Sequence, residues 1–280
     1  MKNKLYFFAI LFFGIIMAGC SSEDDHTSSS VQEDTDTIHL KVMTYNIYSG
    51  QKVYSGPKGV EAIAEVIKQV NPDIVGLEEF ETKSSVVDYQ DMISLLKEET
   101  GLSYSFFVHT TYPHGGDYGN LILSKYPLSE GKRYLLPRED TDVDIYPRAM
   151  GIVSVVKNHT KFHFMVTHLS STLESNRILQ AQSIMDTIAD VTGPIILVGD
   201  MNAYADSSPL NIFYQRFVIS CLNGDYGLTI DTPIPTKAID FILHTPDQGI
   251  TPLSYNVDYD AYYQSDHFPV VATFSIKKNN

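Results

Sequence analysis

The spacing of apolar residues predicts strands and helices that alternate at both ends of the chain. Residues 38–47 alternate apolar and polar side chains, which predicts a first strand. Residues 58–70 carry apolar side chains at helical spacing, which predicts a helix that Asn71 and Pro72 end. The same criteria predict further strands at 73–77, 104–109, 119–124, 148–156, 162–168, 195–198, 239–243 and 268–276, and further helices at 86–99, 173–191 and 210–217.

This order of elements fits two packed sheets with outer helices, although periodicity alone is compatible with other arrangements. The sequence shows no internal repeat and no second domain boundary. A chain of 280 residues, 43% of them hydrophobic, is long enough to bury the core of one large domain.

The strand at 195–198 is apolar throughout, which is typical of a strand buried on both faces. Gly199, Asp200 and Asn202 follow it. Side chains two positions apart in an extended chain point the same way, so the carboxylate and the amide would project together from the carboxyl end of the sheet. Ligands bind there in α/β folds. An Asx turn would explain the same two residues without any site.

Polar side chains end four other predicted strands, where the apolar pattern would otherwise continue. They are Asn46, Glu79, His168 and the pair Asp266-His267. A single residue of this kind is ordinarily a turn former or a hydrogen-bonded core residue. Five such strand ends in one domain predict a shared polar site.

The net charge of the chain limits which partners such a site can bind. Lys and Arg number 20 against 34 Asp and Glu, so the formal net charge is −14. We therefore expect no stable nucleic-acid partner held on a broad cationic surface, although a metal ion can supply local positive charge to a nuclease. The two cysteines, Cys20 and Cys221, indicate no disulfide framework.

The first residues are typical of an export signal. Two lysines precede an apolar run at 5–18, which is short for a membrane span and ends in small residues before Cys20. This end resembles a bacterial lipobox, so we expect a lipoprotein signal peptide over 1–19 and a lipidated Cys20. A plain signal peptide cleaved elsewhere is the alternative.

Residues 20–37 are rich in Ser, Thr and acidic side chains, which predicts a flexible tether. The stretch SSEDD after Cys20 resembles the acidic export signal of some Bacteroidetes-type lipoproteins. We therefore expect a protein that is lipid-anchored to the outer membrane of a Gram-negative bacterium and faces outward. Residues 38–280 would form the folded domain.

Seven short motifs, in this order, resemble those of the endonuclease/exonuclease/phosphatase superfamily. They are MTYNI at 43–47, PDIVGLEE at 72–79, YGNLILS at 118–124, THL at 167–169, GDMN at 199–202, IDFI at 239–242 and SDHFPV at 265–270. Each motif alone is weak, but the ordered set is specific. The family includes DNases, abasic-site endonucleases, inositol polyphosphate 5-phosphatases and sphingomyelinases. The resemblance implies an α/β (α+β) fold: a four-layer α/β/β/α sandwich of two packed, mainly antiparallel sheets with outer helices.

The resemblance also implies a metal-dependent phosphoesterase. Mg²⁺, with Mn²⁺ or Ca²⁺ as substitutes, would bind Glu79 with Asn46 and Asp266 nearby. Asp240 would orient His267, which would activate water or hold the phosphate. The remaining implied catalytic residues are Asp200 and Asn202, which would position the nucleophile, and His168, which would act as an acid or as an oxyanion donor.

Four residues are implied to bind substrate: Asn120, Arg148, Tyr118 and Arg177. Asn120 could instead belong to a turn with Gly119, and either arginine could be a salt-bridged surface residue. Two positions depart from the family pattern: Glu78 stands where Gln is usual, and Ala238 where many members have Arg.

We therefore expect Mg²⁺-dependent hydrolysis of a small or lipid-derived phosphoester by a monomer. An extracellular non-specific nuclease is the alternative, and a non-catalytic binding lipoprotein on the same fold is a second one. Substrate choice would depend on four acidic, Tyr-rich segments that are expected to be loops: 50–58, 111–117, 139–146 and 252–263.

Overall fold

The computed structural model describes residues 36–51, 57–139 and 143–278. The chain divides into two units, Met1–Asp34 and Thr35–Asn280, and the first lies wholly outside the described residues. The signal peptide over 1–19, the lipidated Cys20 and nearly all of the tether over 20–37 lie there too, and they stay predictions. In the ranges that are described, no helix has the length and apolar character needed to cross a membrane.

Two six-stranded sheets form the core of the Thr35–Asn280 unit, in the orders β11-β12-β1-β2-β4-β3 and β5-β6-β7-β8-β10-β9. Neighbouring strands are antiparallel except for the parallel pairs β1–β2 and β7–β8. The first sheet contains β1 (Thr37–Asn46), β2 (Ile74–Thr82), β3 (Tyr104–Thr111), β4 (Asp117–Ser124), β11 (Ile250–Val257) and β12 (Val270–Lys277). The second contains β5 (Leu128–Leu135), β6 (Ala149–Lys157), β7 (Thr160–His168), β8 (Ile195–Asp200), β9 (Val218–Ile219) and β10 (Asp240–His244).

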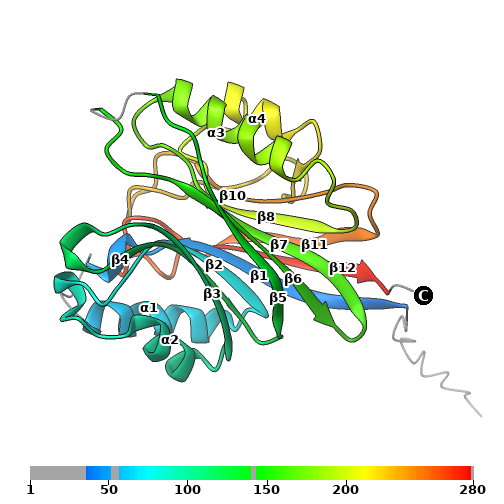
Figure 1. The fold of residues 1–280 in the computed structure, drawn as a ribbon. Helices are drawn as coiled ribbons and strands as arrows, with labels where there is room; N and C mark the ends of the chain where they lie inside the picture. Colours follow the sequence, from blue (N-terminus) through cyan, green and yellow to red (C-terminus); the bar gives the residue numbers. More distant parts are fainter. Residues whose placement is uncertain (1–35, 52–56, 140–142, 279–280) are drawn as a thin grey trace, which may run out of the picture. The chain divides into compact units, whose positions relative to one another are not determined.

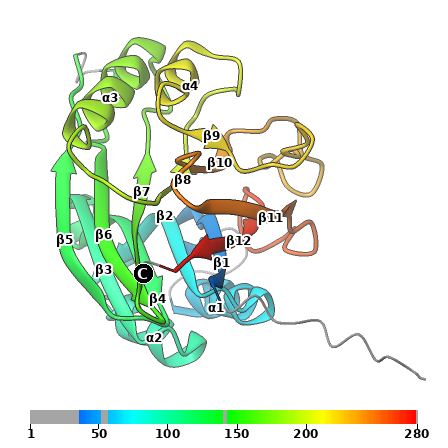
Figure 2. The ribbon, with the colours of Figure 1, turned by 90° about the vertical axis from the view of Figure 1, so that its right-hand side faces the viewer.

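The sheets pack face to face with helices on their outer faces (Figure 1). The first sheet is covered by α1 (Pro57–Val70) and α2 (Met92–Thr100), and the second by α3 (Glu174–Thr187) and α4 (Ser208–Phe213). The turned view in Figure 2 shows the same order of layers. The four-layer sandwich expected from the sequence is confirmed.

Successive side chains of the buried strands point to opposite faces of the sheet, and they supply three apolar cores that hold the layers together. In β8, Ile196 and Val198 join the core between the sheets, while Ile195 and Leu197 join the core beneath α3 and α4. At Gly76 of β2 a Cβ would lie 2.5 Å from a methyl carbon of Val198, so glycine lets the sheets approach closely. Burying one aliphatic side chain of this size stabilises the fold by about 1.5–3 kcal/mol.

A polar contact ties the two sheets where β2 begins. Lys157, the last residue of β6, donates to Asp73 Oδ2 at 2.9 Å and to the carbonyl oxygen of His39 in β1 at 2.6 Å. Asp73 also accepts from the backbone N–H of Lys41 at 3.0 Å. This Asp73–Lys157 clamp therefore connects the second sheet to two strands of the first.

The predicted helix at 86–99 is shorter than expected. Ser85–Val87 form a 3₁₀ turn, and Asp88 and Tyr89 then adopt left-handed φ values of +51° and +56°. The α-helix begins only after Asp91, whose side chain accepts from the backbone N–H of Ser94. The helices predicted at 173–191 and 210–217 also end earlier than expected, since α3 ends at Thr187 and α4 at Phe213.

Three strands carry little sequence signal. The pattern missed β5 because nearly all of its side chains are exposed, and β9 because it is only two residues long. The loop predicted at 252–263 is wrong over its first half, because Ile250–Val257 form β11. This strand is at the edge of its sheet and shifts register after Pro252, a residue tolerated at edges and bulges.

The carboxyl ends of both parallel strand pairs meet at one edge of the sandwich. There β1 ends at Asn46, β7 at His168 and β8 at Asp200, and antiparallel β10 begins at Asp240. The fold therefore gathers polar strand ends that are far apart in the sequence.

Candidate active site

Asp200 lies at the centre of this edge because strand register places it beside His168 and Asp240. Gly199 makes the close approach possible. Its φ is +152°, and a Cβ there would lie 1.9 Å from the carbonyl oxygen of Thr167. Any side chain at this position would collide with the backbone of β7.

An Asx turn does follow β8. Asp200 Oδ1 accepts from the backbone N–H of Asn202 at 2.9 Å, and Asn202 has a left-handed φ of +48°. The turn brings Asn202 Nδ2 to 3.0 Å from His168 Nε2, and the same amide donates to the carbonyl oxygen of Leu169 at 3.2 Å. The turn is therefore part of the site, since it aims the Asn202 side chain at a histidine.

A β-bulge in β2 separates two neighbouring glutamates. The pairing of β2 with β4 shifts between Leu77 and Phe80, and Glu79 within the shift has a φ of +54°. Glu78 is fully buried and accepts from Thr44 Oγ1 at 2.9 Å, whereas Glu79 is partly exposed. A left-handed φ is strained for a glutamate, and such strain gathers at functional sites. The bulge presents Glu79 at the open edge.

Asn46 joins the two sheets at this edge. Its Nδ2 donates to Glu79 Oε1 at 3.2 Å and to Asp200 Oδ2 at 3.0 Å. Its backbone carbonyl accepts from Ser265 Oγ at 2.7 Å, and the whole residue is buried. One fixed amide thus links a carboxylate of the first sheet to a carboxylate of the second.

An imidazole–carboxylate pair lies on the other side of Asp200. His267 Nδ1 is 2.8 Å from Asp240 Oδ2, and His267 Nε2 is 3.8 Å from Asp200 Oδ2. Thr229 Oγ1 donates to the same oxygen of Asp240 at 2.6 Å. Thr229 stands outside every motif, so no sequence signal marked it. Asp266, next to His267, is partly exposed.

Burial and neighbouring charges set the protonation states here. Burial alone would lower the pKa of His267, but the carboxylates of Asp240 and Asp200 outweigh it and raise this pKa to about 10. Burial, with the charge of Asp240, raises the pKa of Asp200, and burial also raises the pKa of Glu79. At neutral pH His267 is therefore an imidazolium among carboxyl groups.

Arg148 fixes the tautomer of His168. Arg148 Nη1 lies 2.8 Å from His168 Nδ1, and a guanidinium only donates, so Nδ1 accepts and the ring proton stays on Nε2. Nε2 therefore takes no hydrogen bond from the nearby Asn202 Nδ2, which donates to the carbonyl oxygen of Leu169. Burial, together with the positive charges of Arg148 and His267, holds the pKa of His168 well below its ordinary value. His168 Nε2 is 3.4 Å from Asp200 Oδ2. His168 therefore presents a neutral N–H donor beside Asp200.

Residues 43–267 match the model of the Endonuclease/Exonuclease/phosphatase family. The chain belongs to this family. Its members are hydrolases that act on phosphoesters, and they generally depend on a divalent metal ion. No curated protein sequence matches the chain significantly.

Solved structures of the Endonuclease/Exonuclease/phosphatase family share the fold. A member from Beutenbergia cavernae is 22% identical with a TM-score of 0.70, over 85% of this chain and 72% of that one. A member from Bacteroides thetaiotaomicron is 17% identical with a TM-score of 0.68, over 86% and 99%. The mannosyl-6-phosphatase Bt3783 of the same organism is 17% identical with a TM-score of 0.64, over 84% and 99%. At these identities the likeness shows the fold alone.

The structure gathers most of the residues that the family resemblance implies for catalysis and metal binding. Hydrogen bonds or close polar pairs join Asn46, Glu79, His168, Asp200, Asn202, Asp240 and His267. Asp266 directly precedes His267, and its Oδ1 lies 3.3 Å from Ser265 Oγ.

Two of the implied substrate-binding residues make structural contacts. Asn120 lies inside β4, so its interpretation as a turn residue is wrong. Its Nδ2 donates to the carbonyl oxygen of Ala149 at 3.2 Å, which ties β4 to β6 in the other sheet. Arg177 in α3 donates to the carbonyl oxygen of Ser170 at 3.0 Å and so supports the loop after β7. For both residues, substrate binding stays a prediction.

The donor set at Glu79 fits a hard divalent cation. Glu79, Asn46 and Asp266 offer carboxylate and amide oxygens, which Mg²⁺ prefers. Burial raises the pKa values of Glu79 and Asp200, and a bound cation would favour the charged form of both carboxyl groups. Among the described residues, one cluster holds three ligand atoms within 4.8 Å: Asp200, Asp240 and His267. The positive charge on His267 makes that cluster a poorer metal site.

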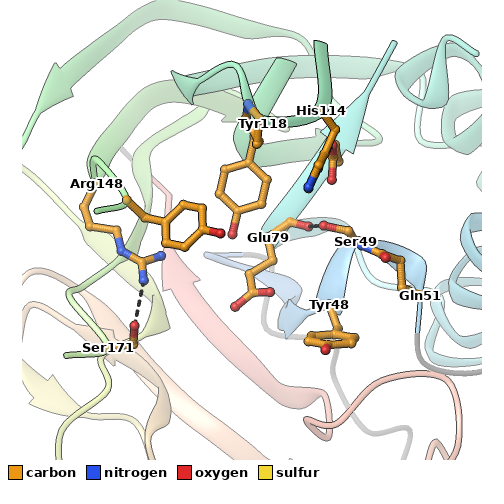
Figure 3. A pocket seen from close by; sticks show the side chains of 11 residues that line it. Tyr48, Ser49, Gln51, Glu79, His114, Tyr118, Arg148 and Ser171 are labelled. Carbon is orange, nitrogen blue, oxygen red and sulfur yellow. Dashed lines mark hydrogen bonds and ion pairs between the residues drawn. The ribbon is translucent and has the colours of Figure 1, made fainter. Parts of the chain in front are cut away.

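A cavity of about 220 Å³ opens beside Glu79 (Figure 3). Two of the implied substrate-binding residues, Tyr118 and Arg148, line it, and Arg148 Nη2 donates to Ser171 Oγ at 3.2 Å. Four further lining residues were not singled out from the sequence because they lie outside the motifs and the flagged loops: Tyr48, Ser49, Glu81 and Ser171. The remaining lining residues include His114 and Tyr146, which fall within the segments flagged at 111–117 and 139–146.

Proposed function

We propose that this protein is a Mg²⁺-dependent hydrolase of a small phosphate ester. The observation that carries the proposal is the continuous chain of polar contacts from Glu79 through Asn46 to Asp200 and on to His168 and His267. These contacts place the neutral N–H of His168 and the imidazolium of His267 on two sides of the buried Asp200 carboxyl group. A module that only binds has no need of this pairing.

Three side chains act directly on the phosphoryl group and the water that attacks it. Asp200, with its raised pKa, takes a proton from the attacking water. His168 Nε2–H and the amide of Asn202 donate to phosphoryl oxygens, where negative charge develops. Of the two roles considered for His168, the tautomer set by Arg148 favours the oxyanion donor.

His267 supports the same step as a cation. Its raised pKa leaves it protonated at neutral pH, so it holds a phosphoryl oxygen or protonates the leaving oxygen and does not act as the base. Asp240 keeps the ring in place through Nδ1. A cation bound at Glu79 would neutralise charge on the phosphoryl oxygens.

A small substrate is favoured over nucleic acid by charge and by size. The net charge of −14 opposes a polyanion, and the cavity beside Glu79 holds about one ring. The fold is shared with a mannosyl-6-phosphatase, which supports a phosphomonoester of this size.

We also propose that a lipid on Cys20 anchors the domain, as a monomer, to the outer face of the outer membrane. Support comes from the lipobox-like end of the apolar run and the acidic stretch after it. Growth with labelled palmitate should label the wild-type protein and leave Cys20→Ala unlabelled. Equal labelling of both would refute the anchor.

The function is tested with the full chain, purified in detergent, on p-nitrophenyl phosphate and on supercoiled plasmid. We expect hydrolysis of the aryl ester that needs Mg²⁺, stops with EDTA and is lost in Asp200→Asn, with no nicking of the plasmid. Mg²⁺-dependent nicking that is lost in the same variant would establish the nuclease alternative. Inactivity on both substrates would favour the binding lipoprotein.

A further inference from the structure

One carboxylate in the cavity beside Glu79 has no part in the chemistry described above. Glu81 lies two residues past Glu79 in β2, and both side chains line the cavity. The side chain of Glu81 is 1% exposed, yet it lines the cavity. Its Oε1 lies 2.9 Å from His114 Nδ1. A buried carboxylate with an imidazole partner therefore forms part of the cavity wall.

The loop that carries His114 is built to hold this ring in place. His114 has a φ of +55° within the turn Pro113–Gly115. At Gly116 a Cβ would lie 2.3 Å from the backbone nitrogen of Ser84, so only glycine lets the loop rest on the end of β2. The imidazole is half-exposed while the carboxylate beneath it is buried. The strained loop therefore offers a polar pair to whatever enters the cavity.

Aromatic side chains complete the cavity around this pair. Strand register places Tyr118 directly opposite Glu81. Figure 3 shows His114 and Tyr118 on one side of the Glu79 carboxylate, Tyr48 on the other, and Arg148 at the end toward Ser171. Tyrosine rings offer flat apolar faces together with hydroxyl groups. The cavity thus combines ring-sized walls, a phosphate-binding guanidinium and a separate hydrogen-bonding pair.

Size and charge limit what can occupy the cavity. Its volume of about 220 Å³ is below the roughly 300–1,000 Å³ of pockets for drug-sized ligands, so it takes about one ring. With Glu79 and Glu81 both in the wall, a second phosphate at the Glu81 end would be repelled. A lipid chain would offer the buried carboxylate no hydrogen-bond donor besides His114, which is costly. Hydroxyl groups supply such donors.

We propose that Glu81 and His114 form a hydroxyl-binding subsite that selects phosphate monoesters of a polyhydroxylated ring, a sugar or a cyclitol. The phosphate lies at the Glu79 and Arg148 end, and a ring hydroxyl donates to the Glu81 carboxylate. This subsite rests on the proposed phosphoesterase function, and it determines which ester that activity prefers.

The test compares kcat/KM for glucose 6-phosphate with kcat/KM for p-nitrophenyl phosphate, in the full chain with Mg²⁺. Hydrogen bonds to a charged group predict that Glu81→Gln lowers this ratio about tenfold or more, mainly through KM. His114→Ala, which removes a half-exposed side chain, lowers it in the same direction. Glu99→Gln in α2 is the matched control, because it removes only an exposed ion-pair partner of Lys68 in α1. It keeps the ratio of the wild type.

Ratios within twofold of the wild type in both variants would overturn the proposal, as would faster hydrolysis of bis-p-nitrophenyl phosphate than of glucose 6-phosphate. If the wild type hydrolyses no ester, the proposed function fails, and calorimetry still decides the subsite. The wild type should then bind glucose 6-phosphate about tenfold more tightly than inorganic phosphate, and His114→Ala should lose that preference. Equal affinities for the two ligands in the wild type would overturn the subsite.

Discussion

Replacing Arg148 should damage the site in a way that depends on pH. In Arg148→Gln, His168 Nδ1 loses a charged donor at 2.8 Å. A hydrogen bond to a charged group contributes about 1.5–3 kcal/mol, and each 1.4 kcal/mol corresponds to about a tenfold change in rate. We therefore expect kcat/KM on an aryl phosphate to fall about 10- to 150-fold at pH 8, because the ring can then move its proton to Nδ1 and lose the Nε2–H donor.

The direction of the pH effect follows from the pKa of His168. Arg148 is one of the charges that hold this pKa well below its ordinary value, so its removal lets the pKa rise. As pH falls through the new pKa, the ring gains a second proton and Nε2–H becomes a donor again. The rate of the variant divided by that of the wild type should therefore increase from pH 8 to pH 6, and taking this ratio cancels the titration of groups that both proteins share.

The assay is a pH–rate profile with saturating Mg²⁺, after thermal unfolding has shown that the variant folds. Arg133→Gln is the matched control, because Arg133 also contacts a histidine, His109, but lies outside the cavity beside Glu79. A loss smaller than threefold, or a rate ratio that does not change with pH, would refute the role given to Arg148.

Three further predictions concern the backbone, the clamp and the metal. Gly199→Ala places a Cβ 1.9 Å from a carbonyl oxygen, so denaturant unfolding should show a loss of at least about 3 kcal/mol, and unchanged stability would contradict the close approach. Burial would raise the pKa of Asp73, but its hydrogen bonds with Lys157 and with the backbone N–H of Lys41 outweigh burial and lower this pKa. The carboxylate therefore stabilises the fold at pH values above its ordinary pKa near 4. Asp73→Asn should thus cost about 1 kcal/mol at pH 7 and nothing near pH 2; a loss equal at both pH values would refute this. Glu79→Gln should raise, at least tenfold, the Mg²⁺ concentration that half-maximally shifts the melting temperature, whereas an unchanged midpoint would place the ion elsewhere.

The centre of the site could be predicted because the sequence marks where buried strands end. Asn46, His168 and Asp200 each interrupt an apolar strand pattern, and the sheet brings such interruptions to one edge. Periodicity could not reveal the bulge that separates Glu78 from Glu79, because a bulge changes pairing without changing the pattern.

The surroundings of the site were harder to predict. Thr229 and Glu81 contact site residues through the fold, and neither belongs to a motif. The edge strand β5 was missed because nearly all of its side chains are exposed, and β11 was missed because Pro252 interrupts its pattern. The role of Arg148, which directly precedes β6, as the partner of His168 at the end of β7 depends on a contact that only the structure shows.

The order of the first sheet has a consequence for biosynthesis. β1 lies between β2 and β12, so the first of the described strands pairs with the one that leaves the ribosome after all the other described strands. Asp266 and His267 directly precede β12. A nascent chain that stops before residue 266 would carry all the strands of the second sheet and still lack both residues. The domain therefore holds no assembled site while it is being translated, and it becomes competent only when its last strand pairs with its first.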